Sequence, residues 1–589
     1  MIDLSKIKSP SDIKGMSMDE LTELTKELRK ALLQKLAAHG GHVGPNLGFL
    51  EATVALHYVF DAPKDKLVFD VSHQTYVHKM LTGRMEAFTD PAHYDDVSGF
   101  TNPKESDYDL FTIGHTSTAI SLAGGLAKAR DLAGGKERVV AVVGDGSLSG
   151  GEAFEGLDFG ATLGSKFIVV VNDNDMSIAE NHGGLYADLR LLRNTNGEGD
   201  PNYFRTLGYA YRYVKYGNDI RSLVKAFEEV KDYPYPVVVH VNTQKGMGYK
   251  YAEAEREKFH FSAPFDIPSG QLLNVSEAPN WAEIFQETTM QLMAENPKMA
   301  LITAGTPGVL GFTPEKRREA GRQFIDVGIA EQEGVALASG MAKGGVRPVF
   351  GVMSSFIQRA YDQLSQDVAI NGNPMVLAIF GTGVYGLNDV THLGWFDIAL
   401  ISNIPGWIFL APTCKEEYVA MLKWAVRQTD YPVAVRQPGG MVWESGNEFP
   451  EDYYDLNKFR ICQKGEKVAV IAAGGTFKAA FDAIGKLYYE GITPTLINPV
   501  FLSGIDREML DDLRKDHDYV ITLEDGVLDG GFGEKIARYY GDSGMKVICR
   551  GIPKEFLDRY NRKNLAAECH LTPDAIESDI RSLYETNSK

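Results

Sequence analysis

Runs of apolar, mostly β-branched residues recur along the chain, and each is followed by a glycine-rich turn and then by a segment of helical spacing. The runs lack the alternation of apolar and polar positions that marks a half-exposed strand, so they predict strands buried on both faces. Strands that alternate with helix-length segments are typical of parallel sheets. The predicted fold class is therefore α/β, with doubly wound parallel sheets. We expect strands near residues 140, 168, 237, 376, 407, 467, 493, 519 and 546.

Two stretches rich in Pro, Ser, Gly and Asn, at 259–280 and 436–458, interrupt this pattern. Their composition is typical of connections between compact units. We therefore expect three α/β domains, at residues 1–272, 273–447 and 448–589. Leucines at helical spacing also predict an amphipathic helix over residues 18–36, whose charged residues form a solvated face.

Length, composition and charge exclude several classes of protein for this chain. The 589 residues, 44% hydrophobic and 24% charged, are ordinary for a globular protein and too many for a single core. A net charge of −19 without a basic run argues against a nucleic acid or an anionic membrane as partner. The longest uncharged stretch is broken by Pro and Gly, and the first residues mix Lys with Asp and Glu, so we expect neither a membrane span nor a signal peptide. The four cysteines form no CxxC pair, which favours reduced thiols and a cytoplasmic protein.

The most informative motif is a pair of turns. GDG at 144–146 and NDN at 172–174 each close an apolar run, and Asp145 and Asn174 are separated by about the length of one strand–helix–strand unit. The carboxyl ends of neighbouring parallel strands meet at one edge of a sheet, where α/β proteins bind ligands. Carboxylate and amide oxygens suit Mg²⁺, and the N–H groups of a glycine-rich turn suit phosphate. GDG alone would more often be a turn with a helix-capping Asp, but the spaced NDN favours a magnesium–diphosphate site.

A second glycine motif, GTGVYG at 381–386, fits the dinucleotide pattern GxGxxG after a predicted strand. No acidic residue follows at the expected distance of about 20 residues, and THLGWFD stands where a helix should run. We interpret this segment as a flexible loop. A nicotinamide oxidoreductase is the alternative function that the motif leaves open.

Two kinds of titratable residue are candidates for catalysis. Several histidines follow a glycine or a strand end, where imidazoles can move protons near neutral pH, although any one alone is more often structural. Their spacing matches no zinc motif. Glu331 stands where a predicted strand meets a helix of small residues, and it is either a helix N-terminal residue favoured by the dipole or a buried acid facing a ligand nitrogen. The histidines are His42, His73, His78, His115, His260 and His392.

Several long strings together resemble the 1-deoxy-D-xylulose-5-phosphate synthase family of transketolase-like enzymes. The resemblance is collinear and covers nearly the whole chain. It implies three α/β domains, a homodimer, and thiamine diphosphate with Mg²⁺ as cofactors, bound between the first two domains. The strings include GGHVGPNLGFLEATVALHYVF, FDVSHQTYVHKMLTGR, TIGHTSTAISLAGGLAKAR, NDNDMSI, KGMGY, IAEQ, SFIQRAYDQLSQDVAI and TLEDG.

The same resemblance implies roles for the matched residues. Asp145, Asn174 and the backbone carbonyl of Met176 would hold Mg²⁺. Glu331 would share a proton with the aminopyrimidine ring of the cofactor, which makes the cofactor nucleophilic, and Phe356 would stack on that ring. Further contacts with thiamine diphosphate would come from His73, Gly114, His115, Thr116, Gly146, Ser147, Lys245 and Tyr249. Catalytic roles would fall to His42, His73, His260 and His392, and substrate binding to His42, Arg359 and His392.

The chain departs from the family where the phosphate of the acceptor would bind. An Asp–Arg pair of the family reads Phe380–Gly381, and a Tyr-Pro-Arg-Gly string reads Gln437–Gly440. Glycine does not replace the charge-assisted contacts of two arginines, so a phosphate would bind roughly two to four decades more weakly. Smaller departures are Met353 for Tyr, Glu333 for His, Asn388 followed by Asp389 for an acidic loop residue, GND for GHD at 217–219, and a shortened loop after NDNDMSI.

The expected activity is that of a carboligase dependent on thiamine diphosphate and Mg²⁺. It would decarboxylate pyruvate and transfer the two-carbon unit to an aldehyde, by default glyceraldehyde 3-phosphate. One alternative is a divergent enzyme with an unphosphorylated acceptor or a transketolase-type donor. Another is a catalytically silent protein that binds the cofactor for a regulatory purpose. The expected partners are small-molecule substrates and a second copy of the chain.

Overall fold

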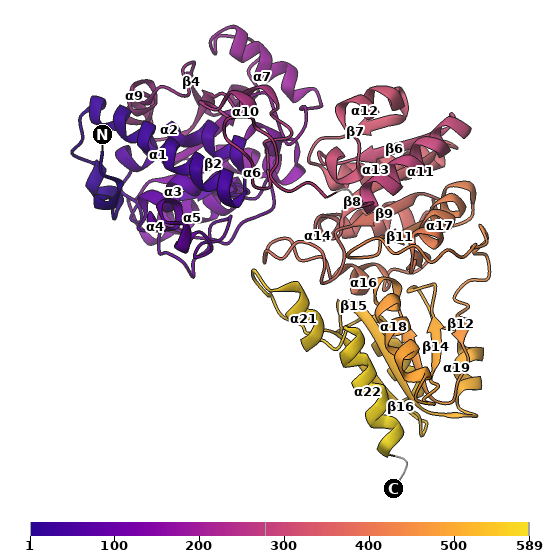
Figure 1. Ribbon diagram of the computed structural model, residues 1–589. Helices are drawn as coiled ribbons and strands as arrows, with labels where there is room; N and C mark the ends of the chain where they lie inside the picture. Colours follow the sequence, from indigo (N-terminus) through magenta and orange to yellow (C-terminus); the bar gives the residue numbers. More distant parts are fainter. Residues whose placement is uncertain (1, 277, 587–589) are drawn as a thin grey trace. The chain divides into compact units, whose positions relative to one another are not determined.

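The computed structural model describes residues 2–276 and 278–586, which form two compact units (Figure 1). The first contains residues 2–276 with Gly328–Ala330, and the second contains 278–327 with 331–586. The first unit has one parallel sheet and the second has two largely parallel sheets, which confirms the α/β prediction. The described residues of 255–280 and 437–459 contain no helix or strand, and the predicted domain boundaries near 272 and 447 stay predictions.

The sheet of the first unit has the strand order β1-β2-β3-β5-β4, with all neighbours parallel. Alternate residues of one strand enter opposite cores, since Val140 and Val142 belong to one hydrophobic cluster and Ala141 and Val143 to another. Because helices cover both faces, the strands have no polar face, which explains the continuous apolar runs. The strands are β1 (Lys66–Phe69), β2 (Val139–Gly144), β3 (Phe167–Asp173), β4 (Ala210–Val214) and β5 (Pro236–Asn242).

The predicted amphipathic helix is α1 (Met18–His39). Ser17 begins it with a capping box that includes Glu20, and Leu21, Leu24 and Leu28 are fully buried. This helix and α2 face one core, whereas α5 and α6 face the other. The remaining helices of this unit are α2 (Val43–Val59), α3 (Tyr76–Leu81), α4 (Glu86–Thr89), α5 (Ala119–Ala133), α6 (Gly151–Ala161), α7 (Leu185–Asn194), α8 (Tyr203–Thr206), α9 (Ile220–Val230) and α10 (Lys250–Ala254).

The second unit begins with a six-stranded parallel sheet of order β10-β11-β9-β8-β6-β7. Its strands are β6 (Met299–Thr303), β7 (Phe324–Asp326), β8 (Arg347–Met353), β9 (Val376–Phe380), β10 (Ile408–Leu410) and β11 (Val433–Arg436). Its helices are α11 (Trp281–Glu295), α12 (Pro314–Ala320), α13 (Glu331–Lys343), α14 (Ser354–Ile357), α15 (Tyr361–Gln363), α16 (Asp397–Ile401) and α17 (Lys415–Arg427).

The other sheet of this unit has the order β12-β14-β13-β15-β16, in which only the β12–β14 pair is antiparallel among the described strands. Its strands are β12 (Arg460–Gln463), β13 (Lys467–Ala472), β14 (Thr495–Asn498), β15 (His517–Val527) and β16 (Lys546–Ile552). Its helices are α18 (Phe477–Tyr488), α19 (Arg507–Leu513), α20 (Phe532–Tyr540), α21 (Arg562–Glu568) and α22 (Pro573–Thr586).

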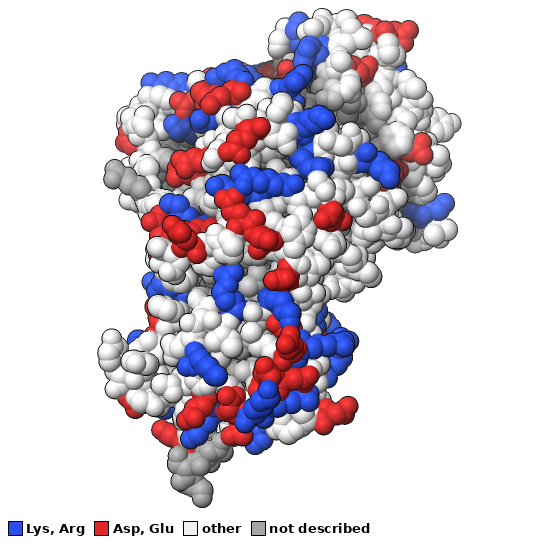
Figure 2. Space-filling model, turned by 90° about the vertical axis from the view of Figure 1, so that its right-hand side faces the viewer, with Lys and Arg blue, Asp and Glu red and all other residues white. Residues whose placement is uncertain are grey.

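Surface and helix properties add two observations. Basic and acidic side chains are interspersed on the face drawn in Figure 2. Over the part of the chain that the structure describes, no helix combines the length and the apolar character that crossing a membrane requires.

Candidate functional site

The first group of candidate residues lies in the first unit, where two neighbouring strands end. Gly144 at the end of β2 pairs with Asn172 of β3. The buried carboxylate of Asp145 follows directly and accepts hydrogen bonds from the backbone N–H of Met176 (3.0 Å) and from the side-chain amide of Asn181 (2.8 Å). The GDG and NDN turns are therefore in contact.

The oxygen atoms of these turns fit a divalent cation. Burial, with the neighbouring Asp173 carboxylate, raises the pKa of Asp145, so a bound cation would stabilise its ionised form. The Oδ1 atom of Asn174 is buried and accepts no hydrogen bond from the described residues. Among those residues, no group of three or more His, Cys, Asp or Glu side chains could hold a metal. A cation here would thus need further oxygens from the backbone and from a phosphate, which is typical of Mg²⁺.

The same turns form a cradle for an anion. A Cβ atom on Gly146 would lie 2.9 Å from Cβ of Ser177, so glycine allows the two turns to approach. Lys245 is 2% exposed, and its ammonium group donates to the backbone carbonyl of Ser177. Burial lowers the pKa of Lys245 to about 7, although Asp145 raises it. A bound anion would favour the charged lysine, so the residues present fit a diphosphate beside the cation.

The turn at 114–116 is fixed by a carboxylate that the sequence analysis missed. Asp70 follows β1 and accepts hydrogen bonds from the N–H groups of Ser117 (2.8 Å) and Ala119 (3.0 Å), at the start of α5. The Ser117 hydroxyl donates to the backbone carbonyl of Ser147 (2.9 Å). The residues that directly follow the 114–116 turn and the GDG turn are therefore in contact. A carboxylate directly after a buried strand is the signal that could have identified Asp70.

Three predicted histidines come together from segments far apart in the chain. The ring centroids of His42 and His73 are 5.0 Å apart, those of His42 and His260 are 5.7 Å apart, and those of His73 and His260 are 5.2 Å apart. The side-chain amide of Asn46 donates to the backbone carbonyls of His42 and His73 (2.7 Å each), which fixes two of the segments. Burial, and then the charge of Lys245, hold the pKa of His260 well below its usual value, so this imidazole is neutral.

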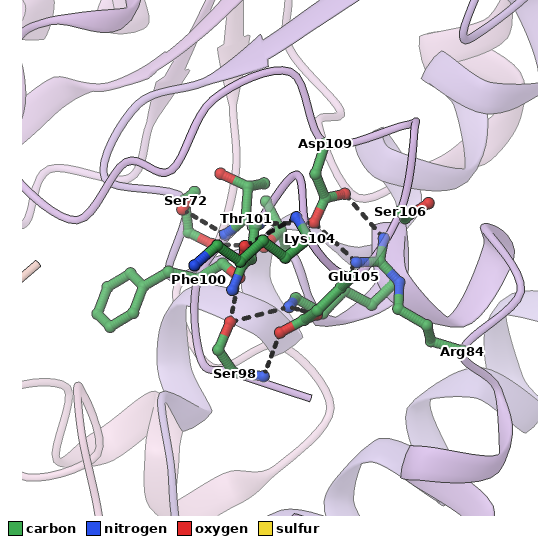
Figure 3. Close-up of polar contacts among 12 residues, drawn as sticks. Ser72, Arg84, Ser98, Phe100, Thr101, Lys104, Glu105, Ser106 and Asp109 are labelled. Atoms are coloured by element: carbon green, nitrogen blue, oxygen red, sulfur yellow. Dashed lines mark hydrogen bonds and ion pairs between the residues drawn. The ribbon is translucent and has the colours of Figure 1, made fainter. Parts of the chain in front are cut away.

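Phe100, which the sequence analysis missed, borders this histidine cluster. It is 8% exposed, and its ring centroid lies 5.7 Å from that of His42. The hydroxyl of Ser98 donates to the Phe100 carbonyl (2.8 Å), and the N–H of Thr101 donates to Oγ of Ser72 (2.8 Å). In Figure 3 the Phe100 ring points away from these polar contacts.

An ionic network of low solvent exposure holds the segment that carries Phe100 (Figure 3). Arg84 donates to both oxygens of Asp109 (2.7 and 2.8 Å) and to Glu105 (3.2 Å). Glu105 accepts the N–H of Ser98, and Asp109 accepts that of Asn102 (2.7 and 2.8 Å). Burial raises the pKa of Asp109, but hydrogen bonds from Arg84 and from a histidine lower it by more. The Asp109 carboxylate therefore stays ionised, and the network ties the segment 98–109 together.

Two other predicted residues have partners within the fold. His78 lies in the same network, with Nε2 2.8 Å from Asp109 Oδ1 and Nδ1 2.8 Å from His57 Nε2. Tyr249 is buried in an aromatic cluster, 5.6 Å from the ring centroid of Phe265, and its hydroxyl donates to a backbone carbonyl (3.1 Å). These contacts fix both side chains within the fold, and the contact of Tyr249 with the cofactor stays a prediction.

The second unit carries the other group of candidates. Glu331 begins α13 and is 2% exposed, and Arg359 donates to its Oε2 atom (3.3 Å). Burial raises the pKa of Glu331, while the charge of Arg359 opposes this shift. Glu331 can therefore hold a proton that an exposed glutamate would lose.

His392 lies beside Phe356, with 5.5 Å between the ring centroids. The hydroxyl of Thr391 is 2.8 Å from Nδ1 of His392, and Asp389 Oδ1 is 3.7 Å from the same nitrogen. Burial raises the pKa of Asp389, but the nearby His392 imidazole and hydrogen bonds from Thr391 lower it. The carboxylate accepts the Thr391 hydroxyl, which in turn contacts Nδ1 of His392, so Asp389 orients the imidazole through Thr391.

An acidic side chain lies close to Gly439, one of the two glycines that stand where the family has arginines. A Cβ atom on Gly383 would meet Oδ2 of Asp525 at 1.9 Å, and one on Gly439 would lie 3.5 Å from it. Asp525 is 5% exposed and forms an ion pair with the buried Arg436 (2.5 Å). Phe380 packs on Phe285, with 4.9 Å between ring centroids. Arg436, the basic residue three positions before Gly439, is bound by the carboxylates of Asp397 and Asp525.

Family profiles match most of the chain. Residues 4–200 match the profile described as 1-deoxy-D-xylulose-5-phosphate synthase. Residues 277–442 match the transketolase pyrimidine binding domain, and residues 457–576 match the transketolase C-terminal domain.

Individual proteins are similar over nearly the full length. A 1-deoxy-D-xylulose-5-phosphate synthase of Symbiobacterium thermophilum is 38% identical, with 98% of this chain and 95% of that protein covered. 1-Deoxy-D-xylulose-5-phosphate synthase 1 of Geobacter metallireducens is 36% identical, with 99% of each covered. Among solved structures, a transketolase from Leishmania mexicana is similar with a TM-score of 0.43 and 15% identity, covering 97% of this chain and 98% of that chain.

Proposed function

Because this chain belongs to the 1-deoxy-D-xylulose-5-phosphate synthase family, whose activity is a thiamine diphosphate-dependent carboligation, we propose that it uses Mg²⁺ with that cofactor to add two carbons of pyruvate to an aldehyde. The observation that carries the assignment to this chain is the pair of joined turns in the first unit. There the buried Asp145 carboxylate contacts the segment that follows Asn174. The Oδ1 atom of Asn174 itself lacks a hydrogen-bond partner among the described residues.

The residues of the first unit would bind the charged end of the cofactor. Asp145, Asn174 and the carbonyl of Met176 would hold Mg²⁺, while Lys245 and the glycine turn would neutralise the diphosphate. Thiamine diphosphate, when bound, supplies a carbon nucleophile and an electron sink for decarboxylation. The neutral His260, with His42 and His73, would orient a substrate and move protons.

The residues of the second unit would act on the cofactor ring and the substrate. Burial raises the pKa of Glu331 and so favours its protonated form, which can donate to a ring nitrogen. Phe356 would pack on the ring. His392, oriented by Asp389, would contact the substrate together with Arg359.

This chain differs from the family at the residues that would bind the acceptor, so the identity of the acceptor needs a separate argument. The family name implies glyceraldehyde 3-phosphate as acceptor, with 1-deoxy-D-xylulose 5-phosphate as product. The glycines at 381 and 439 and the buried Asp525 carboxylate favour a second candidate, an unphosphorylated aldehyde. A phosphate bound without the two arginine contacts would lose roughly two to four decades of affinity.

Product analysis tests both candidates. We would mix the protein with Mg²⁺, thiamine diphosphate and ¹³C-pyruvate, add glyceraldehyde 3-phosphate, glyceraldehyde or glycolaldehyde in separate tubes, and identify products by NMR. We expect pyruvate consumption in every tube and a higher KM for the phosphorylated acceptor than for glyceraldehyde. A KM for glyceraldehyde 3-phosphate as low as that for glyceraldehyde would contradict the acceptor proposal. No consumption of pyruvate, with cofactor still bound, would instead indicate a regulatory binding protein.

Assembly and location are also proposals. The family resemblance supports a homodimer, and the absence of a CxxC pair supports a cytoplasmic protein with reduced thiols. Sedimentation of the purified full-length chain would measure the number of subunits.

A further inference from the structure

Arg193 joins the two acidic residues that flank Asn174. It lies in the last turn of α7, and its Nη1 atom donates to both oxygens of Asp173 (2.7 Å each) while Nη2 lies 2.7 Å from Oδ1 of Asp175. Asp173 precedes Asn174 and Asp175 follows it, so one guanidinium group spans the turn. We infer that Arg193 is a positioning residue that holds Asn174 in place for the cation, an inference that rests on the proposed function.

The backbone of this turn needs such support. Asp175 has a φ of +58°, in the left-handed region that costs a residue other than glycine roughly 1 kcal/mol. Aspartate tolerates this conformation better than most residues, and its N–H donates to Oδ1 of Asp173 (3.1 Å). The two contacts of Arg193 oppose relaxation of the same turn.

Asp173 itself is fixed to the sheet. Nε2 of His240, on β5, lies 2.7 Å from Oδ2 of Asp173, and the hydroxyl of Tyr211, on β4, lies 2.7 Å from Nδ1 of His240. The side chains of Asp173 and His240 are fully buried, and that of Arg193 is 12% exposed. Arg193 therefore connects a rigid buried anchor to Asp175, whose side chain is 45% exposed.

Helix α7 also contacts the other ligand-bearing turn. The hydroxyl of Tyr186 donates to the backbone carbonyls of Asp145 (3.1 Å) and Gly146 (3.3 Å). The helix thus braces both turns that would surround the cation. Groups that orient metal ligands typically change metal affinity by 10- to 100-fold when they are substituted.

The test is a titration of the full-length protein with Mn²⁺ in the presence of thiamine diphosphate and without substrate. Electron paramagnetic resonance measures the free Mn²⁺ and so gives the affinity. We expect Arg193→Gln to weaken binding by about 10- to 100-fold. Asp175→Asn should weaken it less, because it removes one exposed contact and leaves the buried pair intact. Arg190→Gln, at an exposed position of the same helix, is the matched control and should bind as the wild type does.

Hydrogen–deuterium exchange of the same proteins without cation gives a second measurement. We expect faster exchange at residues 174–182 in Arg193→Gln, with unchanged exchange in β2. The inference would be overturned if Arg193→Gln and Asp175→Asn both had the Mn²⁺ affinity and the hydrogen–deuterium exchange of the wild type. A wild type that binds no Mn²⁺ would overturn the proposed metal site and this inference with it, an outcome that the wild-type titration alone identifies.

Discussion

At the scale of a single residue, the environment of Glu331 determines its chemistry more than its residue type does. A carboxylate in the first turn of a helix is ordinarily stabilised in its ionised form by the helix dipole. Glu331 is buried at the start of α13, and burial raises its pKa against the opposing charge of Arg359. Glu333, two residues further along the same helix, is exposed. The two glutamates therefore allow a matched comparison of a buried acid with a solvated one.

We expect Glu331→Gln to abolish the proton exchange that this acid would promote. The rate of deuterium exchange at C2 of bound thiamine diphosphate should fall by about 10²- to 10⁴-fold, because glutamine keeps the shape but cannot transfer a proton to the ring. Quenched-flow NMR measures this rate without any substrate. Glu333→Gln is the control and should exchange at the wild-type rate. Unchanged exchange in Glu331→Gln would contradict the role of Glu331.

At the scale of an element, helix α20 begins against a buried carboxyl group. The N–H groups of Phe532 and Gly533 donate to Glu524 (2.8 and 2.7 Å). Burial raises the pKa of Glu524 to about 7, from an ordinary value of 4.5, although these hydrogen bonds lower it. The folded protein therefore binds this proton more tightly than the unfolded chain does.

This difference predicts a pH-dependent stability. The contribution is fully present below pH 4.5 and is lost as pH rises to about 7, because the unfolded chain releases the proton first. The loss amounts to about 3 kcal/mol in the free energy of unfolding. In Glu524→Gln, the thermal midpoint measured by circular dichroism should depend less on pH between about pH 5 and pH 7. Glu534→Gln, exposed on the same helix, should keep the wild-type slope, and an unchanged slope in Glu524→Gln would refute the argument.

The elements also show how much the sequence could predict. The nine expected strands match β2, β3, β5, β9, β10 and β13 to β16, most of which are interior strands with continuous apolar runs. The sequence analysis did not list the interior strands β6, β8 and β11, nor the edge strands β1, β4 and β12. Two of the edge strands, β4 and β12, read AYRYV and RICQ. Edge strands have one solvent-exposed side and carry polar residues, so the apolar signal is weak.

In the candidate site, too, some contacts could be predicted from the sequence and others could not. The contact between the GDG and NDN turns could be predicted, because parallel strands place their carboxyl ends at one edge of a sheet. The contacts of Arg193 and Phe100 could not, because they depend on how a helix and a long loop pack onto that edge. No local spacing in the sequence encodes these contacts.

At the scale of the whole molecule, the cores explain why the chain divides into two units. One hydrophobic cluster of the second unit contains Ile379 from one sheet and Ile471 from the other. Arg436, at the end of β11, also binds Asp397 and Asp525, the second of which lies in β15. Two sheets that share a core and a buried ion pair are expected to unfold together. The first unit has cores of its own, made from buried residues between 7 and 265.

Calorimetry of the full-length protein should therefore show at least two thermal transitions, since separate units need not unfold in one step. A ligand that binds only the folded state at 100 times its Kd stabilises that state by about 2.7 kcal/mol. Because Asp145 and Lys245 lie in the first unit, thiamine diphosphate with Mg²⁺ should raise the midpoint of a transition that includes this unit. Excess EDTA should reverse the shift, and Asp145→Asn should remove it. A shift that survives in Asp145→Asn would show that the cofactor is held without this carboxylate, and a single transition would contradict the independence of the two units.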